Sequence, residues 1–347
     1  MSVGWGIIGI GRHPDLKVVP AMKLAAETKL IAAFSRDRGR ADAFAGKHGF
    51  QTAYDSLPDL LHDPRIDAVY ISSPNFLHAP YTKQAAEAGK HVLVEKPMAL
   101  NVKDAREMVQ VCGQNGVKLG VGFQLRHHPG HRKARELIRE GILGRITLAQ
   151  GQFFYPDPRG MVELPGRTDL SEWWDKPEMV GWSYSIMGMG VHIVDLLQFL
   201  LGNPIVEVAA MTNGQTASRP LDDIAAIVLR FQNGVLGTAC CGRRVPDSEN
   251  DAMIYGTDGR VALRDTVREA CGGTLEVTSS TVTLEEPYEK DLLTLYKRQV
   301  EAFNRAVRKG EDFDASGEDG LKIVQITSAI IEAASTGRSV KIDPVRV

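Results

Sequence analysis

The sequence has few cysteines, and their spacing predicts neither a metal site nor a disulfide framework. Only four are present among 347 residues, namely Cys112, Cys240, Cys241 and Cys271. None of their spacings matches a zinc site or a disulfide-rich scaffold. Cys240 and Cys241 stand in an apolar strand pattern, so we expect both to be core residues. The composition suits a reducing compartment.

The sequence also lacks an excess of either charge. Lys plus Arg number 41 and Asp plus Glu 43, which leaves a formal net charge of -2. This balance gives no basis for nucleic acid or an anionic membrane as partner. No apolar run is long enough to span a bilayer, and the first strand pattern follows no basic region of a signal peptide. We therefore expect a cytoplasmic protein.

Internal repeats and low-complexity segments are absent, and the chain is long for a single hydrophobic core. In the first third, short apolar runs alternate with helical patterns. The expected strands cover residues 4–11, 29–35, 67–73, 90–95 and 118–123, and the helices between them cover 16–27, 40–49, 79–89 and 102–116. Strands separated by helices of this length predict an α/β domain with a doubly wound parallel sheet.

The pattern changes after Phe123. The expected elements are a helix over 129–141, strands over 146–155, 205–214, 224–231 and 235–242, a hairpin over 252–265, and helices over 292–310 and 316–335. Asn233-Gly234 and Asp258-Gly259 are typical of hairpin turns. The sequence thus predicts a second α/β domain with a large, mostly antiparallel open sheet, and it divides the chain into residues 1–123 and 124–347.

The first strand ends in a glycine turn. Gly9 and Gly11 would let the backbone turn tightly and approach a pyrophosphate at a helix N-terminus, with Arg12 and His13 beside it. Pro14 stands where the usual dinucleotide-binding pattern has a third glycine or alanine. The position of the turn, directly after the first strand of an alternating chain, favours a dinucleotide site.

The end of the second strand bears on the choice of cofactor. A fold that selects NAD places an acidic residue there to bind the ribose 2′-hydroxyl. Ser35 occupies that position here, followed by Arg36 and Arg40, and guanidinium groups suit a 2′-phosphate. NADP(H) is therefore favoured, and Asp37 leaves NAD(H) possible.

The most specific string in the sequence is "GKHVLVEKPMAL". An apolar strand ends in Glu95, Lys96 and Pro97, at the edge of a parallel sheet where ligands bind. Pro97 restricts the backbone after Lys96 and is a candidate for a cis peptide bond. The lysine would thus be held in one direction rather than move freely in solvent.

The chain resembles the Gfo/Idh/MocA family of NAD(P)-dependent oxidoreductases over essentially its whole length. The resemblance rests on "GKHVLVEKP", "SSPNFLH", "GFQLRHHPGHRKARELIREGILGRI", "GVHIVDLLQFLLG" and "SGEDGLK", and it is greatest to the sugar-reducing members. It implies a Rossmann domain, a second domain whose open sheet forms a homodimer or homotetramer, and hydride transfer at a hydroxyl or carbonyl carbon of a sugar or cyclitol. No metal is implied.

The resemblance also assigns the catalytic residues. Lys96 matches the family's lysine, which stabilises negative charge on the reacting oxygen. His192 matches the histidine that exchanges a proton with that oxygen. Members usually carry an aspartate four residues before this histidine, but the position is Gly188 here. We expect Asp195 to orient or charge the imidazole instead, and Gly188 to leave room for a bulkier substrate or a water.

The remaining site residues follow from the same match. The cofactor-binding residues expected besides those above are Ser73, Pro74, Asn75 and His78, and the substrate-binding residues besides Lys96 and His192 are Gln124, Arg126, Tyr155 and Trp182. His127 and His128 are interpreted as polar residues near the domain junction. The long segment 153–184 holds three of the four tryptophans. Its Trp173 and Trp174, with Arg159 and Arg167, either line a sugar site or fasten the loop.

Three functions stay open at this point. The favoured one is an NADP(H)-dependent sugar or cyclitol oxidoreductase. The second is a glycosidase or epimerase that recycles its cofactor through transient oxidation. The third is a non-catalytic NADP-binding regulatory protein, for which Gly188 is the main argument.

Overall fold

The computed structural model describes residues 2–156, 172–214 and 220–343, which form two compact units. The first unit comprises residues up to Gln124 together with Leu292–Leu321, and the second comprises Leu125–Asp291 and the chain from Lys322 onward. The boundary after residue 124 lies next to the predicted one. The segment 292–321 differs from the prediction, because it returns to the first unit.

The first unit contains a parallel sheet of six strands. In spatial order these are β3 (Thr52–Tyr54), β2 (Thr28–Phe34), β1 (Val3–Ile8), β4 (Ala68–Ile71), β5 (His91–Val94) and β6 (Leu119–Val121). The order reverses between β1 and β4, so loops that follow these strands diverge there and leave a crevice for a ligand. β1, β4 and the end of β5 are buried on both faces, as expected for a parallel sheet covered by helices.

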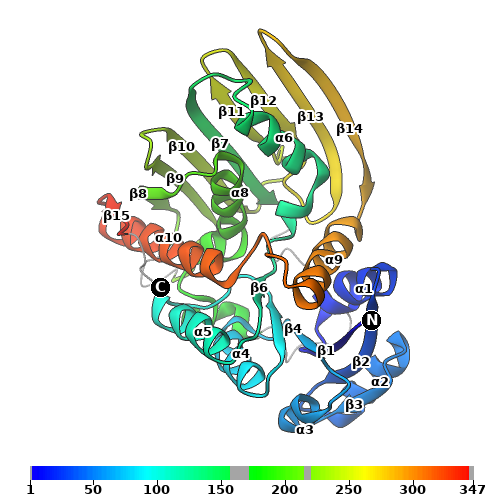
Figure 1. The fold of residues 1–347 in the computed structure, drawn as a ribbon. Helices are drawn as coiled ribbons and strands as arrows, with labels where there is room; N and C mark the ends of the chain where they lie inside the picture. The colour runs from blue at the N-terminus through cyan, green and yellow to red at the C-terminus, as the bar shows by residue number, and fades with distance from the viewer. Residues whose placement is uncertain (1, 157–171, 215–219, 344–347) are drawn as a thin grey trace. The chain divides into compact units, whose positions relative to one another are not determined.

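Helices cover both faces of this sheet. They are η1 (Pro14–Val18), α1 (Val19–Leu24), α2 (Arg38–His48), α3 (Leu57–His62), η2 (Asn75–Leu77), α4 (His78–Glu87), α5 (Val102–Gln114) and α9 (Thr294–Lys309). Figure 1 shows α4 and α5 together on one side of the sheet and α1 with α9 on the other. The chain runs outward from β1 through β2 and β3, and then outward on the other side through β4, β5 and β6, so right-handed crossovers place the helices of the two halves on opposite faces.

A buried polar contact explains why α9 belongs to the first unit. Trp5 of β1 is fully buried, and its Nε1 donates to Oδ1 of Asn304 on α9 at 3.0 Å. The Asn304 amide in turn donates to the Ala26 carbonyl at 2.9 Å and to the Thr28 hydroxyl at 2.8 Å. The helical pattern of 292–310 predicts the helix, but it carries no information on which sheet the helix covers.

The second unit is built on a sheet of nine strands. In spatial order they are β14 (Thr283–Asp291), β13 (Cys271–Ser279), β12 (Gly259–Arg264), β11 (Ala252–Gly256), β7 (Ile146–Tyr155), β10 (Leu236–Arg243), β9 (Ile224–Phe231), β8 (Ile205–Thr212) and β15 (Val340–Lys341). Only β7 and β10 pair in parallel. The predicted α/β fold, with a doubly wound parallel sheet and a mostly antiparallel open sheet, is confirmed.

Helices cover one face of this sheet. Those that pack on its strands are α6 (Pro129–Arg139), η5 (Ile186–Gly190) and α8 (Val191–Leu201). The second unit also contains η4 (Glu172–Asp175) and α7 (Pro177–Val180); η3 (Gln124–His127) stands at the boundary between the units, and α10 (Gly317–Thr336) begins in the first unit and continues in the second. Figure 1 shows α6 and α8 on the same side of the sheet. A side chain at Gly151 of β7 would contact Ile193 and Leu197 of α8, so α8 lies directly on the strand.

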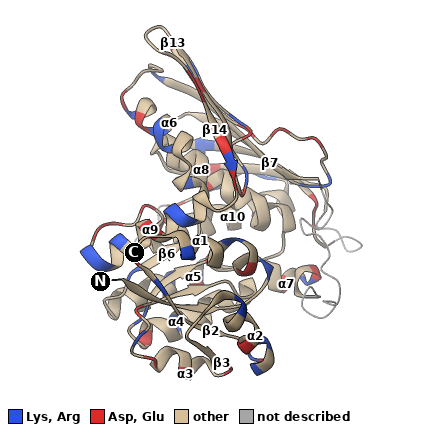
Figure 2. Cartoon of the chain, turned by 90° about the vertical axis from the view of Figure 1, so that its right-hand side faces the viewer, with Lys and Arg blue, Asp and Glu red and all other residues tan. Residues whose placement is uncertain are grey.

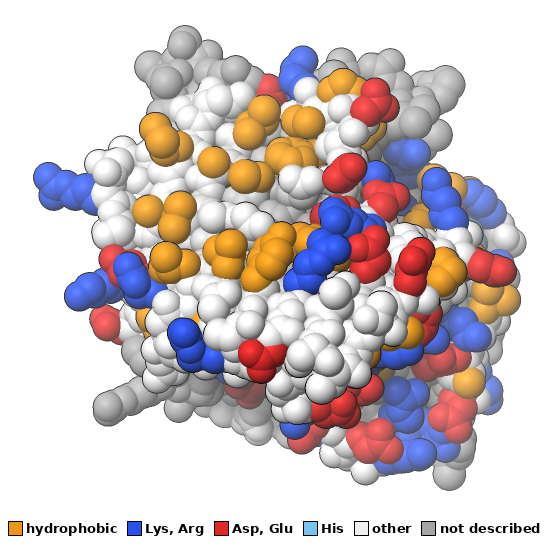
Figure 3. All heavy atoms as spheres, turned by 90° about the horizontal axis from the view of Figure 1, so that it is seen from above, with side chains coloured by type: hydrophobic (Ala, Val, Ile, Leu, Met, Phe, Trp, Pro, Cys, Tyr) orange, Lys and Arg blue, Asp and Glu red, His pale blue; other side chains and the backbone are white. Residues whose placement is uncertain are grey.

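The opposite face of this sheet is apolar but exposed. Met211 on β8 is 79% exposed and Val228 on β9 is 51% exposed, and the register places both with Leu236 on the same face. Cys240 shares that face and is half-buried, whereas Cys241 points into the core. The prediction that both are core residues is therefore wrong for Cys240, because neighbouring strand residues face opposite sides. Figure 3 shows hydrophobic side chains gathered over part of one face.

Charged side chains of both signs are mixed over the described parts of the chain (Figure 2). All four cysteines are free. None of the described helices combines the length and the apolarity needed to cross a lipid bilayer.

Candidate active site

The glycine turn after β1 packs against the loop after β4. Gly9 has a φ of +96°, and a Cβ there would lie 2.6–2.7 Å from the backbone of Ser72 and Ser73. Gly11, by contrast, has no atom of the described part of the chain within 4 Å of the position of a Cβ. The hydroxyl of Ser73 is buried and has no hydrogen-bond partner among the described residues. The fold therefore requires a glycine at position 9, whereas Gly11 and the Ser73 hydroxyl of the neighbouring loop are available to a ligand.

The loop after β2 presents two arginines. The Asp37 carboxylate accepts from the Arg40 backbone N–H at 2.8 Å and caps α2, so it already has a structural partner. Arg38 pairs with Asp42 one turn along the helix. The side chains of Arg36 and Arg40 make no ion pair with any residue that the structure describes. Ser35 is half-buried at the end of the strand.

Glu95, Lys96 and Pro97 follow β5 directly. The Lys96–Pro97 peptide bond is cis, as the sequence suggested. The buried Glu95 carboxylate contacts His13 Nε2 at 2.9 Å, accepts from the Tyr70 hydroxyl and accepts from the Lys96 backbone N–H at 3.2 Å. Burial raises the pKa of Glu95, but the His13 contact, the charge of Lys96 and the Tyr70 hydroxyl together hold it below the usual range of a glutamate.

His78 joins two loops of this site. Its ring is buried, and its two nitrogens face backbone oxygens, Nδ1 the Pro97 carbonyl at 2.8 Å and Nε2 the Ser73 carbonyl at 2.9 Å. Burial lowers the pKa of His78, which favours a neutral ring that donates to one of the two oxygens. Both ring nitrogens of His78 thus have backbone partners, and its expected role in cofactor binding stays a prediction. Asn75 is buried beside it, and Pro74 precedes it.

His192 lies in the first turn of α8, within the second unit. The residue is 2% exposed, and its ring packs edge-on against Phe153 of β7 with ring centres 5.5 Å apart. The preceding turn, η5, is a π-helix that runs into α8, and Gly202 ends α8 in the left-handed conformation. The continuous helical path from η5 into α8 and the packing of the ring on Phe153 hold the imidazole in place.

The two glycines before His192 have different surroundings. A Cβ at Gly190 would lie 3.0 Å from the sulfur of Cys241, so this glycine permits close packing on β10 rather than close approach of a substrate. A Cβ at Gly188 would meet no atom of the described residues within 4 Å. The position that differs from the family pattern is therefore open.

Ser185 does not cap the helix with its own side chain. Instead its N–H donates to the carboxylate of Asp222 at 3.2 Å, the Tyr184 N–H does so at 2.8 Å, and the hydroxyls of Ser183 and Ser185 donate to the same group. The fully buried Asp222 thus accepts the hydrogen bonds at the start of this helical segment. A negative charge at a helix N-terminus is favourable, but nothing in the string "LDDI" distinguishes this aspartate from its neighbour.

Asp195 forms a buried ion pair with Arg126. Arg126 Nε lies 3.1 and 3.0 Å from the two carboxylate oxygens, and Nη2 lies 2.6 Å from Oδ1. Both side chains are less than a tenth exposed. The guanidinium also lies over the ring of Phe199, 5.4 Å from its centre. The pair fastens the η3 segment to α8, and the Arg126 fork that we assigned to substrate faces Asp195.

Two models of known families match the chain. Residues 3–123 match the oxidoreductase family with an NAD-binding Rossmann fold, and residues 131–262 match the GFO/IDH/MocA C-terminal domain. The chain belongs to the Gfo/Idh/MocA family. The resemblance seen in the sequence is therefore confirmed.

Relatives of this family match over nearly the full length. A 1,5-anhydro-D-fructose reductase of Ensifer adhaerens is 32% identical over 98% of both chains. A D-xylose 1-dehydrogenase (NADP(+)) of Haloferax volcanii is 31% identical over 98% of this chain and 99% of its own. Among solved structures, the aldose-aldose oxidoreductase of Caulobacter crescentus, complexed with glycerol, is 25% identical with a TM-score of 0.86, covering 99% of this chain and all of its own.

The other residues assigned to substrate lie in varied surroundings. Burial and the neighbouring Glu269 carboxylate raise the pKa of Tyr155 well above its usual value. Trp182 is 59% exposed, and Gln124 is buried. Trp173 and Trp174 stack with ring centres 4.2 Å apart, which fits the fastening role. Arg159 and Arg167 lie outside the described residues.

Two histidines after Gln124 connect the start of α6 to the chain around Thr266 and Gly272. His128 accepts from the Gly130 N–H and its Nε2 faces the Gly272 carbonyl, so it caps α6. His131, which sequence reasoning missed, contacts the Leu125 carbonyl and the Thr266 hydroxyl. His127 is buried. Among the described residues, no group of three or more His, Cys, Asp or Glu side chains is placed to hold a metal ion.

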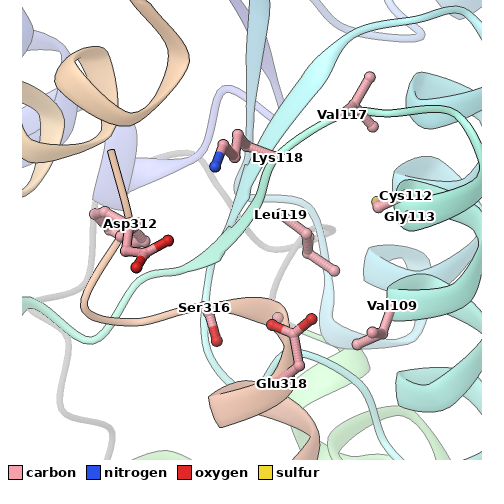
Figure 4. A pocket seen from close by; sticks show the side chains of 11 residues that line it. Val109, Cys112, Gly113, Val117, Lys118, Leu119, Asp312, Ser316 and Glu318 are labelled. Carbon is pink, nitrogen blue, oxygen red and sulfur yellow. The ribbon is translucent and has the colours of Figure 1, made fainter. Parts of the chain in front are cut away.

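A cavity of about 410 Å³ lies elsewhere in the first unit (Figure 4). It is lined by the end of α5, including Cys112, by Lys118 and Leu119 at the start of β6, and by Phe313 and Glu318. These residues lie at the amino ends of the strands, whereas Gly9 and Lys96 lie at the carboxyl ends. The cavity is therefore separate from the candidate cofactor site.

Proposed function

We propose that this Gfo/Idh/MocA oxidoreductase is NADP(H)-dependent and acts at a hydroxyl or carbonyl carbon of a sugar, sugar derivative or cyclitol. The observation that carries the proposal is the Glu95-Lys96-Pro97 turn, which follows β5 of the sheet whose first strand ends in the Gly9 turn. The names of the relatives, a sugar reductase and a sugar dehydrogenase, support the substrate class.

The residues at the carboxyl edge of the parallel sheet suit a dinucleotide. Gly9 keeps the turn tight, the open position at Gly11 leaves space for a pyrophosphate, and Ser73 offers an unsatisfied hydroxyl. Arg12, Pro74 and Asn75 would complete the binding site. When bound there, the nicotinamide cofactor supplies or accepts the hydride.

Arg36 and Arg40 support a preference for the phosphorylated cofactor. Their charges are not neutralised by an ion pair with described residues, and Asp37 is engaged at the start of α2. We expect replacement of both by alanine to lower the ratio of kcat/KM for NADPH to that for NADH by about 10-fold or more. Arg38→Ala is the matched control, because Arg38 already pairs with Asp42. An unchanged ratio in the double variant would contradict the assignment.

Lys96 and His192 handle the reacting oxygen. The Lys96 ammonium donates to it and stabilises its developing negative charge. His192 gives up or takes the proton, because an imidazole titrates near neutral pH. We expect Lys96→Met and His192→Ala each to lower kcat by about 100-fold or more. Near-normal turnover in either variant would contradict this role.

Asp195 and Gly188 set the surroundings of His192, Asp195 by orienting its ring and Gly188 by leaving space. Asp195 shares a helix face with His192, and its bond to Arg126 holds that face in place. The space at Gly188 would admit a bulkier substrate or a water. Gly188→Asp, which restores the family residue, should fold normally and alter the relative kcat/KM of small and large sugars. Asp195→Asn should lower kcat.

One experiment separates the three possible functions. Purified protein is incubated with NADPH and a panel of keto-sugars, with NADP and the matching polyols, and with NADP and glycosides. Absorbance at the nicotinamide band is followed, and the sugars are analysed by NMR. Net turnover with a sugar supports the oxidoreductase. Conversion of a glycoside or epimer without net cofactor change would indicate transient oxidation, and binding without conversion would indicate the regulatory protein that the missing aspartate raises as an alternative.

We also propose that the protein works as a homo-oligomer in the cytoplasm. The exposed apolar face of the nine-stranded sheet is the surface that a second copy would cover.

A further inference from the structure

The buried carboxylate of Glu95 connects the lysine turn to the glycine turn. Its Oε2 accepts from the backbone N–H of Lys96 at 3.2 Å, and its Oε1 accepts from Tyr70 and lies 2.9 Å from Nε2 of His13. A Cβ on Gly122 would lie 3.1–3.3 Å from both carboxylate oxygens, so β6 leaves this group little room to move. Each oxygen is thus engaged, one by Lys96 and the other by His13 and Tyr70.

His13 is fixed from two sides. Its ring packs edge-on against Tyr296 of α9, with ring centres 5.3 Å apart, while Nε2 contacts Glu95. The side chain is 28% exposed and that of Glu95 is 10% exposed. Because His13 stands two residues after Gly11 and Glu95 one residue before Lys96, this contact joins the two turns of the candidate cofactor site directly.

The contact with His13 helps to keep the buried Glu95 carboxylate charged. Burial favours the neutral form of Glu95, and His13 is the main partner that opposes this effect. A buried carboxylate that loses such a partner is left with fewer hydrogen bonds than it needs, which strongly favours movement or protonation. Either change would alter the group that holds the Lys96 backbone.

We propose that His13 is a positioning residue for Lys96, acting through Glu95, and not a cofactor-binding residue. The inference rests on the proposed function, because it assigns Lys96 to the reacting oxygen. It revises the expectation that His13 binds the dinucleotide: in the structure the imidazole nitrogen Nε2 is directed to the carboxylate. The resemblance to the family supplied no such role for this position.

The test compares His13→Leu with His13→Gln, whose amide can still donate to Glu95. The control is His91→Gln, since His91 is also half-buried but accepts from the Lys118 N–H at the start of β6, at the other edge of the sheet. Three quantities are measured for each variant: kcat, the NADPH dissociation constant from nicotinamide fluorescence, and the rate at which an amine-reactive reagent modifies Lys96, followed by peptide mass spectrometry.

The proposal predicts that His13→Leu lowers kcat by about 10-fold or more, since small displacements of a catalytic group are costly. It also predicts an altered rate of Lys96 modification and an NADPH dissociation constant within about threefold of wild type, a change of less than 1 kcal/mol. His13→Gln should recover most of kcat, and His91→Gln should match wild type in all three quantities.

Other outcomes would overturn it. A weakened NADPH affinity with unchanged kcat would make His13 a cofactor-binding residue. Unchanged kcat and Lys96 reactivity in His13→Leu would remove the link, and equal losses in the Leu and Gln variants, with a lowered Tm, would indicate a structural role only. Failure of the proposed function can be told apart from failure of this proposal. If the wild type turns over no sugar, the proposed function is refuted. The rate of Lys96 modification in the His13 variants still shows whether His13 positions the lysine.

Discussion

At the level of single residues, Gly9 and Gly11 differ although both belong to one short turn. Gly9 has a positive φ and no space for a Cβ, whereas Gly11 has open space around it. Sequence reasoning identified both glycines but could not separate them, because the difference depends on how the Ser72–Ser73 backbone packs against the turn. The same limit applies to His78, whose two backbone partners lie on different loops.

These surroundings give a matched pair of variants. Gly9→Ala should lower the free energy of unfolding by about 2 kcal/mol or more, because it forces a side chain into a left-handed and crowded position. Gly11→Ala should leave that free energy nearly unchanged but weaken NADPH binding, since its methyl group would occupy the ligand space. Urea unfolding and fluorescence titration measure the two effects. Equal destabilisation by both substitutions would contradict the account.

Glu95 should make stability depend on pH in a specific direction. Its pKa is lower in the folded protein than the usual value of about 4.3. The charge therefore stabilises the fold above that usual value, and the contribution is lost as the pH falls below it toward the folded-state pKa. The difference in unfolding free energy between wild type and Glu95→Gln should thus shrink between pH 6 and pH 3. A difference that stays constant or grows on acidification would exclude a lowered pKa.

At the level of elements, α8 is held in place by two buried carboxylates. Asp222 accepts from the turn before η5, and Asp195 binds Arg126. The sequence identifies His192 in the string "GVHIVDLLQFLLG" through its resemblance to the family. It does not predict these partners, since Asp222 lies 37 residues from Ser185 and Arg126 lies 69 residues from Asp195.

The ion pair leads to a test of stability. Arg126→Met should destabilise the second unit by about 3–5 kcal/mol, because it leaves a buried carboxylate without its partner. Arg126→Met combined with Asp195→Leu should recover much of that loss, since an apolar pair of similar volume avoids the unpaired charge. Thermal and urea unfolding of the single and double variants measure both effects. A double variant less stable than Arg126→Met would contradict this explanation.

Strand prediction succeeded for long apolar patterns and missed β3, β13 and β14. β7 and β9 match their predicted ranges, 146–155 and 224–231. β3 has only three residues, too few for a periodic signal. β14, "TLEEPYEKD", is an edge strand with a largely exposed sequence, and such strands lack the apolar alternation of a half-buried strand.

At the level of the whole molecule, neither of the two units is a single continuous stretch of the chain. The segment 292–321 returns to the first unit because Asn304 completes the hydrogen bonding of buried Trp5. Composition and periodicity sufficed for the fold class and for the Lys96 turn. Which sheet α9 packs against depends on tertiary contacts, and no local sequence pattern contains these.

The exposed apolar face leads to a prediction about assembly. Val228→Glu places a charge in the middle of that face and should reduce the molecular mass measured by light scattering, because burial of an unpaired charge is costly. Leu24→Glu serves as the control, since Leu24 is 59% exposed on α1 and lies outside the nine-stranded sheet. A mass unaffected by Val228→Glu would argue against assembly through this face.

The central claim, hydride transfer to a sugar carbonyl, is tested most directly by isotope transfer. NADPH deuterated at the nicotinamide C4 is incubated with the keto-sugar that the panel identifies, and the product is analysed by mass spectrometry and NMR. The account predicts deuterium on the new carbinol carbon in wild type and its near absence in Lys96→Met and His192→Ala. Product formed without deuterium by the wild type, or equal transfer by all three proteins, would contradict it.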